Sequence, residues 1–334
     1  MKRSCISKRK RAWNFIVLAM VACLVGIATV SAEALPNITV NDNRARAGKL
    51  ESGVLTLHLE LGKGVWHPGA EDGTAAQPLS AIETYAFAEA GHELQTPGPL
   101  IRVLQGTELR VTVHNALPVE TFIHGIEQHP GDSKKAVELK PGETKELSFT
   151  AGEPGSYLYW ATTGADERDD SDGAMSGAFI VDAPDTRTDD RIFVIQLWNR
   201  DILTPNFQAI LTINGKSWPY TERLQARIGH SEHWRIINAS EATHPMHLHG
   251  FYFTVDGVGD GLIAHHLSEG ERRLAVTEVV EPHHTFDMTW MPQRTGNWLF
   301  HCHILDHMSS YFSPFFYGPG SPATPAHAHH ADNH

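Results

Sequence analysis

The stretch PGETKELSFTAGEPGSYLYWATT, residues 141–163, aligns without a gap on PHHTFDMTWMPQRTGNWLFHCHI, residues 282–304. A proline, a threonine, a glycine, a leucine and several aromatic residues fall at matching positions. Residues 106–116 match residues 229–239 in the same way, since each segment starts with Gly and ends with Asn-Ala. The two shifts, 141 and 123 residues, have the length of a domain rather than of a solenoid unit. The sequence therefore predicts two copies of one domain.

Both copies have the sequence pattern of β-sheet domains. Short apolar or alternating runs, such as residues 109–113 and 234–237, recur between Gly, Pro and Asn, without long helical periodicity. This pattern is typical of β-sandwiches, so we predict an all-β fold of two tandem Greek-key sandwiches. We expect domain 1 at residues 48–185 and domain 2 at residues 189–318, joined by the acidic linker DAPDTRTDD.

Both ends of the chain lie outside these domains. A basic start, an apolar run and the A-x-A pattern of Ala32-Glu33-Ala34 predict a signal peptide over residues 1–34. The protein is then periplasmic or secreted. The alternative is an uncleaved anchor, because the apolar run could nearly span a bilayer. The end of the chain, residues 319–334, is rich in Pro, Ala and His, and we expect a disordered tail that could hold a metal loosely.

The composition excludes some partners and highlights histidine. The 334 residues include 27 Lys and Arg against 39 Asp and Glu, which gives a net charge of −12. Such an acidic protein repels nucleic acid and anionic lipid, so we expect neither nucleic acid nor, after signal cleavage, a membrane as a partner. The 22 histidines contrast with only three cysteines, Cys5, Cys23 and Cys302. Signal cleavage leaves Cys302 alone, and a disulfide framework is excluded.

Two histidine motifs stand out in domain 2, HPMHLHG at residues 244–250 and HCHILDH at residues 301–307. Side chains on a strand point alternately to its two faces. If each motif is extended, its alternate histidines share one face, and Cys302 points away from His301 and His303. One strand can then contribute to two metal sites.

The chemistry of these donors favours copper. A thiolate with two imidazoles is the trigonal arrangement of blue-copper sites, and Cys302, His244 and His307 supply it. Zinc is the alternative, because Cys and His also bind zinc. Structural zinc sites usually contain two or more cysteines, however, and only one is available here.

The two motifs resemble the C-terminal copper motifs of multicopper oxidases, the laccase-like proteins built from cupredoxin domains. The likeness includes PGPLIRVLQGTELRVTVHNALP at residues 97–118 and covers most of residues 50–312. Copper nitrite reductases fit worse, because their cysteine is preceded but not followed by a histidine. The resemblance implies cupredoxin-like domains and copper as the cofactor.

The resemblance also implies roles for single residues. The type 1 copper ligands are His244, Cys302 and His307. Ligands of a trinuclear copper cluster, at the type 2 and type 3 positions, are His247, His249, His301 and His303. The axial position of the type 1 site falls on Phe312. Electrons are expected to cross the backbone between the two sites, which makes His301, Cys302 and His303 the candidate catalytic residues.

Domain 1 departs from the family pattern. At the four positions where the family has cluster histidines, this chain has Phe122, His124, Trp160 and Thr162. Only His124 is retained, so we expect it as one further metal ligand. His129 could add a ligand, as could any histidine of a loop. Five ligands do not obviously hold three coppers, and they could hold one or two.

These observations lead to two hypotheses. The first is an exported copper oxidoreductase that takes electrons from a small-molecule or metal-ion reductant and reduces dioxygen at a second copper site. The second is a copper-binding or electron-transfer protein without oxidase activity, because domain 1 lacks most cluster ligands. By analogy with related two-domain oxidases, we expect a homotrimer with the cluster between domain 2 of one subunit and domain 1 of the next, since a closed ring buries both faces.

Overall fold

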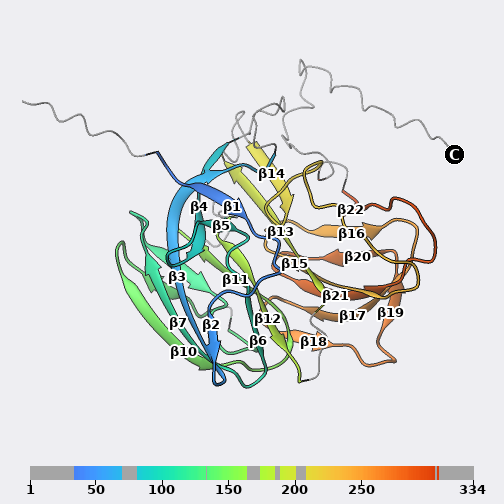
Figure 1. Cartoon of the computed structure of the whole chain (residues 1–334), viewed down its shortest axis with the longest axis horizontal. Coiled ribbons are helices and arrows are strands. Elements are labelled where there is room, and N and C mark those ends of the chain that lie inside the picture. Colours follow the sequence, from blue (N-terminus) through green and yellow to red (C-terminus); the bar gives the residue numbers. More distant parts are fainter. Residues whose placement is uncertain are drawn as a thin grey trace, which may run out of the picture. The chain divides into compact units, whose positions relative to one another are not determined.

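The computed structural model describes residues 34–69, 81–132, 134–163, 174–184, 189–200, 208–304 and 307. Residues 1–33 of the predicted signal peptide, the predicted tail and Phe312 lie outside these residues. The secondary-structure elements of the described residues are the strands β1 to β22, which confirms the all-β prediction (Figure 1). In the part of the chain that the structure describes, no helix is long and apolar enough to cross a membrane.

Strands β1 to β12 form two sheets. The larger has the order β1 (Asn37–Val40), β5 (Gln95–Thr96), β4 (Ile82–Glu89), β3 (Val54–Trp66), β7 (Glu108–Asn115) and β10 (Thr144–Thr150), with β2 (Lys49–Glu51) paired to β3. The smaller has the order β6 (Ile101–Leu104), β12 (Ser176–Asp182), β11 (Gly155–Thr162), β8 (Thr121–His124) and β9 (Val137–Leu139). Their shared core joins Leu55 and Leu57 of β3 to Tyr157 of β11 and Phe179 of β12.

Strands β13 to β22 form two further sheets. The larger has the order β14 (Gln208–Ile213), β13 (Arg191–Arg200), β15 (Glu232–Asn238), β21 (Thr285–Trp290), β17 (Phe253–Gly259) and β18 (Ala264–His266), with β19 (Arg273–Ala275) paired to β17. The smaller has the order β20 (Thr277–Val280), β16 (His244–Leu248) and β22 (Phe300–Cys302). Trp234, Phe253 and Phe286 of the larger sheet pack with Met246 of the smaller one.

The internal repeat reappears in the backbone. β7 pairs antiparallel with β10, and their counterparts β15 and β21 pair in the same way. Gly125 and Gly250 occupy matching left-handed positions with φ of 74° and 83°. Gly142 matches His283, which adopts φ of 60° although it has a side chain. Parallel pairs such as β3–β7, β6–β12 and β13–β15 lie among the antiparallel ones, because the chain crosses between sheets before it returns.

A buried ionic network joins the first group of strands to the second. Arg102 of β6 donates to Asp182 at 2.7 Å and to Asp190 at 2.6 Å, and Arg235 of β15 donates to Asp190 and pairs with Asp287 at 3.3 Å. Burial alone would raise the pKa of Asp190, but the two arginines hold it below its ordinary value. Asp182 and Asp190, the first and last residues of the predicted linker, are therefore part of this buried network. The described residues from Leu35 onward form one compact unit, and the domain boundaries stay a prediction.

Candidate metal centre

Strand pairing sorts the motif residues onto opposite faces of the three-stranded sheet. β16 pairs antiparallel with β22, so that Met246 lies opposite Cys302 and His247 opposite His301. Met246 is only 1% exposed, and Cys302 packs against the same core. Opposite residues of paired strands share a face, and neighbours along a strand alternate. Cys302 therefore points inward and His301 outward, as the sequence pattern predicts.

Three metal-binding side chains meet on the inner side. One donor atom from each of His244, Cys302 and His307 lies within 4.8 Å of the other two. Cys302 Sγ is 3.5 Å from His307 Nδ1, and the rings of His244 and His307 are 4.9 Å apart between centroids. Among the described residues, this is the one group of three or more His, Cys, Asp or Glu so arranged. One sulfur and two imidazoles are the donor set of a blue-copper site, so these residues fit copper.

The buried ring of His244 has one nitrogen available to a metal. Its Nε2 lies 2.9 Å from Ser240 Oγ, whereas its buried Nδ1 has no hydrogen-bond partner within the described residues. Burial, and to a smaller extent the charge of His307, lowers the pKa of His244 to about 3. The ring is therefore neutral near pH 7. An unpartnered buried nitrogen is costly unless something binds it, and a metal ion at Nδ1 would do so.

The thiol of Cys302 is suited to a metal rather than to free reactivity. Burial raises its pKa, and the backbone N–H of Ile304 opposes this effect only in part. A half-buried thiol whose pKa is raised stays largely protonated without a cation, whereas coordination to a metal deprotonates it. The N–H of His307 donates to the carbonyl of Ile304 at 3.0 Å, and this turn brings the imidazole back beside the sulfur.

The outer side of the same sheet carries a second group, which we call the four-histidine cluster. It consists of His247, His249, His301 and His303. Ring centroids within it are 4.9 to 5.7 Å apart, and the Nε2 atoms of His249 and His301 are 2.9 Å apart. His249 and His303 are exposed to solvent. Four imidazoles so close together supply the nitrogen donors that suit a copper ion.

Hydrogen bonds orient two rings of the four-histidine cluster. His247 Nδ1 lies 2.8 Å from Thr277 Oγ1, and His301 Nδ1 donates to the carbonyl of Cys302 at 2.8 Å. A carbonyl only accepts, so His301 carries its proton on Nδ1 and presents Nε2 to the cluster. Burial, followed by the charge of His249, lowers the pKa of His247, and burial is also the main cause that lowers the pKa of His301.

Gly250, which ends the first motif, is required by local geometry. Its φ of 83° is a left-handed conformation that strains residues with a side chain. A Cβ at this position would lie 2.5 Å from the Trp298 ring. Arg294 stacks over Trp298 and Phe251 at 4.6 and 4.8 Å and donates to the carbonyl of Gly250 at 3.0 Å. These contacts fix the chain directly after His249.

In domain 1 an aromatic stack occupies the corresponding place. His124 is buried and stacks on Trp160, with centroids 4.8 Å apart and planes 8° apart. Trp160 also contacts His283 at 4.8 Å, and its strand pairs Thr162 with Phe122. The His124 ring therefore packs against Trp160, whereas the rings of the four-histidine cluster pack against one another.

His129 has a different environment. It is 1% exposed, stacks on Tyr157 with centroids 3.9 Å apart, and packs edge-on against Phe179 in the core of the first sandwich. Its Nδ1 lies 3.3 Å from the carbonyl oxygen of Leu262. Burial lowers the pKa of His129 to about 4. These contacts are those of a core histidine, so the structure gives no support to His129 as an additional ligand.

Sequence reasoning missed the residues that support the ligands: Ser240 beside His244, Thr277 beside His247, and Trp298 beside Gly250. Ser240 follows the Asn-Ala pair that ends one repeated segment, and this pair was its only signal.

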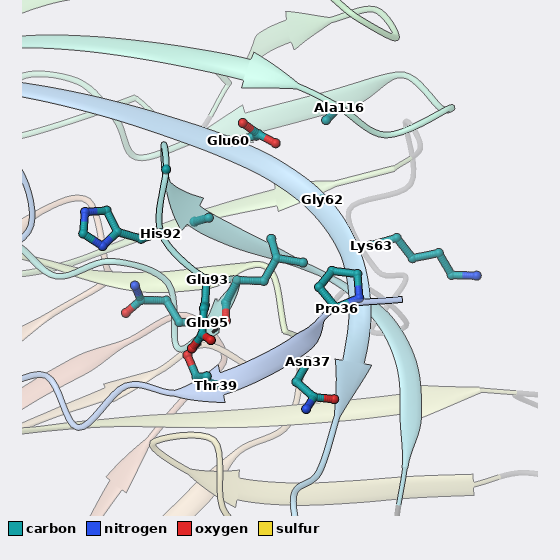
Figure 2. A pocket seen from close by; sticks show the side chains of 13 residues that line it. Pro36, Asn37, Thr39, Glu60, Gly62, Lys63, His92, Glu93, Gln95 and Ala116 are labelled. Carbon is teal, nitrogen blue, oxygen red and sulfur yellow. Dashed lines mark hydrogen bonds between the residues drawn. The ribbon is translucent and has the colours of Figure 1, made fainter. Parts of the chain in front are cut away.

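A cavity of about 1160 Å³ lies on the first sandwich (Figure 2). Its lining includes Glu60 and Lys63 of β3 and, in the turn after β4, His92 and Glu93. None of the predicted copper ligands lines it. The candidate metal centre is therefore defined by the donor atoms of His244, Cys302 and His307 and not by this cavity, because the chemistry of a metal site depends on donor type and geometry.

Comparison with known proteins agrees with this assignment. Two family models, each described as multicopper oxidase, match residues 88–186 and 193–316. A laccase of Bacillus subtilis is 31% identical over 117 residues, covering 29% of this chain and 22% of its own length. A probable nitrite reductase-hydroxylamine oxidoreductase fusion protein of Kuenenia stuttgartiensis is 24% identical over 70% of this chain and 28% of its own length. The chain thus spans only about a quarter of these relatives.

Solved structures share the fold. A multicopper oxidase called mgLAC has a TM-score of 0.61 at 22% identity, covering 75% of this chain and 79% of its own. A copper nitrite reductase of Nitrosomonas europaea has a TM-score of 0.59 at 18% identity, covering 78% of this chain and 94% of its own. At these identities the likeness establishes the cupredoxin-like fold alone. With the two family matches on either side of residue 190, the chain belongs to the multicopper oxidase family, which implies copper as its cofactor.

Proposed function

We propose that this protein is an exported copper-dependent oxidoreductase that passes electrons from a small-molecule or metal-ion reductant to dioxygen. The observation that carries the proposal is that a His₂Cys donor set and the four-histidine cluster lie on opposite faces of one sheet. Copper would supply one-electron transfer at the first site and reduction of the acceptor at the second.

The chain itself connects the two sites. His301 and His303 flank Cys302, so each is one peptide bond away from the residue that carries the sulfur. His301 also donates from Nδ1 to the carbonyl oxygen of Cys302 at 2.8 Å, which adds a hydrogen-bonded link. His244, which is buried, and His307, which is half-buried, lie beside the half-buried thiol of Cys302. These features support His301, Cys302 and His303 as the residues that join electron entry to electron exit.

A second copy of the chain is part of the proposal. The four-histidine cluster faces outward, with His249 and His303 exposed, and within the described part of the chain it offers only four of the eight imidazoles of a complete trinuclear cluster. A homotrimer in which domain 1 of a neighbour covers this face would bury it and bring His124 toward it, and ring closure leaves no face open.

The alternative function is copper binding or electron transfer without oxidase activity. Trp160 and His124 favour it, because in domain 1 they stack on each other where the family has ligands. Nitrite is a second acceptor to test, because a relative that covers 70% of this chain is named a probable nitrite reductase fusion.

Copper content, spectrum and turnover of the purified mature protein test the proposal together. We expect an intense thiolate-to-copper absorption band, more than one copper per chain, and oxygen consumption with a phenolic or ferrous donor. Cys302→Ser should abolish the band, whereas His265→Ala, an exposed histidine outside both motifs, should leave it intact. One copper per chain without oxygen or nitrite consumption would favour the electron-transfer alternative. Absence of the band in the wild-type protein would refute both.

A further inference from the structure

The side chain of Asn238 is held in one orientation. It is fully buried, and its Nδ2 donates to the carbonyl oxygens of Ala242 at 2.7 Å, Glu281 at 2.9 Å and Val280 at 3.3 Å. Carbonyl oxygens only accept hydrogen bonds, so the amide nitrogen must face them. The amide oxygen, Oδ1, therefore faces the other way, toward Ser240.

Asn238 in turn fixes the hydroxyl group of Ser240. Ser240 Oγ donates to Asn238 Oδ1 at 2.8 Å, and Ala242 O, at 3.3 Å, is another acceptor for the same hydrogen. A hydroxyl group has one hydrogen, so once it is donated the oxygen can only accept. His244 Nε2, 2.9 Å from Ser240 Oγ, must then be the donor.

This chain of donors decides which nitrogen of His244 carries the proton. With the proton on Nε2, the lone pair is on Nδ1, which is buried without a hydrogen-bond partner within the described residues. The reverse tautomer would bury an N–H at Nδ1 with no acceptor, which is costly. We propose that Ser240, oriented by Asn238, is a positioning residue that fixes this tautomer and directs Nδ1 of His244 toward a metal bound with Cys302. The inference rests on the proposed type 1 copper site.

Domain 1 provides an internal comparison. Asn115 also donates to two backbone carbonyl groups, at 2.8 and 3.0 Å, and accepts from the N–H of Leu117 at 3.0 Å. In the repeat, Leu117 corresponds to Ser240, and the alignment that matches Gly125 with Gly250 places Val119 opposite His244. Both copies thus have an asparagine whose side chain bonds to backbone groups of the following loop. The hydroxyl group of Ser240 occurs only in the copy that has the ligand His244.

Loss of the hydroxyl group should weaken the site in a specific way. An imidazole that donates its second N–H to an acceptor is a more basic ligand, and loss of such a partner typically costs about 10- to 100-fold in metal affinity. The more highly charged Cu(II) benefits more from a basic ligand than Cu(I). We therefore expect Ser240→Ala to weaken Cu(II) binding about 10-fold relative to Cu(I), which corresponds to a rise in reduction potential of about 59 mV.

The first experiment measures reduction potential by redox titration of the thiolate-to-copper band, and Cu(II) affinity by chelator competition, in the copper-loaded full chain. Ser240→Thr, which keeps the hydroxyl group, should retain the wild-type potential. Ser217→Ala is the matched control, because Ser217 is also fully buried and bonds to Pro68 instead. An unchanged potential in Ser240→Ala, or an equal rise in Ser217→Ala, overturns the proposal.

The second experiment needs neither copper nor a folded Ser240→Ala variant. Long-range ¹H–¹⁵N correlation spectra of metal-free wild-type protein, labelled at its histidine rings, report each tautomer, and His244→Gln identifies the His244 signal by its loss. The proton is expected on Nε2, and a proton on Nδ1 overturns the inference. If wild-type protein lacks the thiolate-to-copper band, the proposed function fails while this measurement still decides the tautomer.

Discussion

Replacing His129 with Phe should make the protein less sensitive to acid. The imidazole lies in an apolar core, stacked on Tyr157, and burial lowers its pKa to about 4 from an ordinary value of 6.5. As the pH falls below about 6.5, the unfolded chain takes up a proton at this residue and the folded chain does not. The stability that neutral His129 contributes is therefore complete above that pH and is lost as the pH falls toward 4.

The size of this effect follows from the difference between the two pKa values. A difference of about 2.5 units corresponds to roughly 3 kcal/mol, of which about 2 kcal/mol is lost between pH 7 and about pH 4.5. His129→Phe retains an aromatic ring against Tyr157 and loses the contact with the carbonyl of Leu262, a cost of about 1 kcal/mol that does not depend on pH.

Urea denaturation of wild type and variant at the two pH values isolates the titrating part. The stability difference between them should change by about 2 kcal/mol in favour of the variant at the lower pH. Tyr157→Phe is the control, because it alters the stacking partner and its bond to Glu153 but not the titrating group, and its effect should be equal at both pH values. An equal stability difference between wild type and His129→Phe at pH 7 and 4.5 would falsify the assignment of His129 as a neutral core histidine.

Three further substitutions test other parts of the structure. Gly250→Ala should lower stability by at least about 1–2 kcal/mol, because the left-handed φ is strained and the new Cβ meets Trp298; urea midpoints measure this, and an unchanged midpoint contradicts it. Asp190→Asn should cost about 3 kcal/mol of unfolding free energy, since it leaves buried arginine charge unpaired; a loss below about 1 kcal/mol in the same assay would mean that water reaches the network. Thr277→Val should weaken metal binding at the four-histidine cluster about 10-fold by removing the partner of His247, while the thiolate-to-copper band persists; copper counts at limiting metal check it, and parallel loss of both signals counts against it.

The alternation of side chains made the metal centre predictable from sequence. With period two, the order His301-Cys302-His303 already separates the sulfur from its neighbours, and the observed pairing of β16 with β22 agrees. Strand type was predictable for the same reason, because residues such as Leu55 and Leu57 alternate with polar ones. Both inferences need only the local geometry of a strand.

Pairing between strands was less accessible. In domain 2, His247 pairs with His301. The repeat matches these two residues with Phe122 and Trp160 of domain 1. Trp160 nevertheless pairs with His124, two residues beyond Phe122. A shift of two residues keeps every side chain on its own face, so the hydrophobic pattern cannot reveal it. Asp182 and Asp190 pose a similar problem, because acidic residues in a linker look solvated until their arginine partners, distant in sequence, are known.

β22 is only three residues long, and both metal-binding faces depend on it. An ion bound on either face would restrain the same short backbone segment, so that part of the ordering entropy needed by the other face has already been lost. Loading of the two faces should then be positively coupled, and half-filled molecules should be rarer at limiting copper than independent binding allows. A protein built in this way tends to bind copper at both sites or at neither, which limits the population of redox-active molecules with only one site filled.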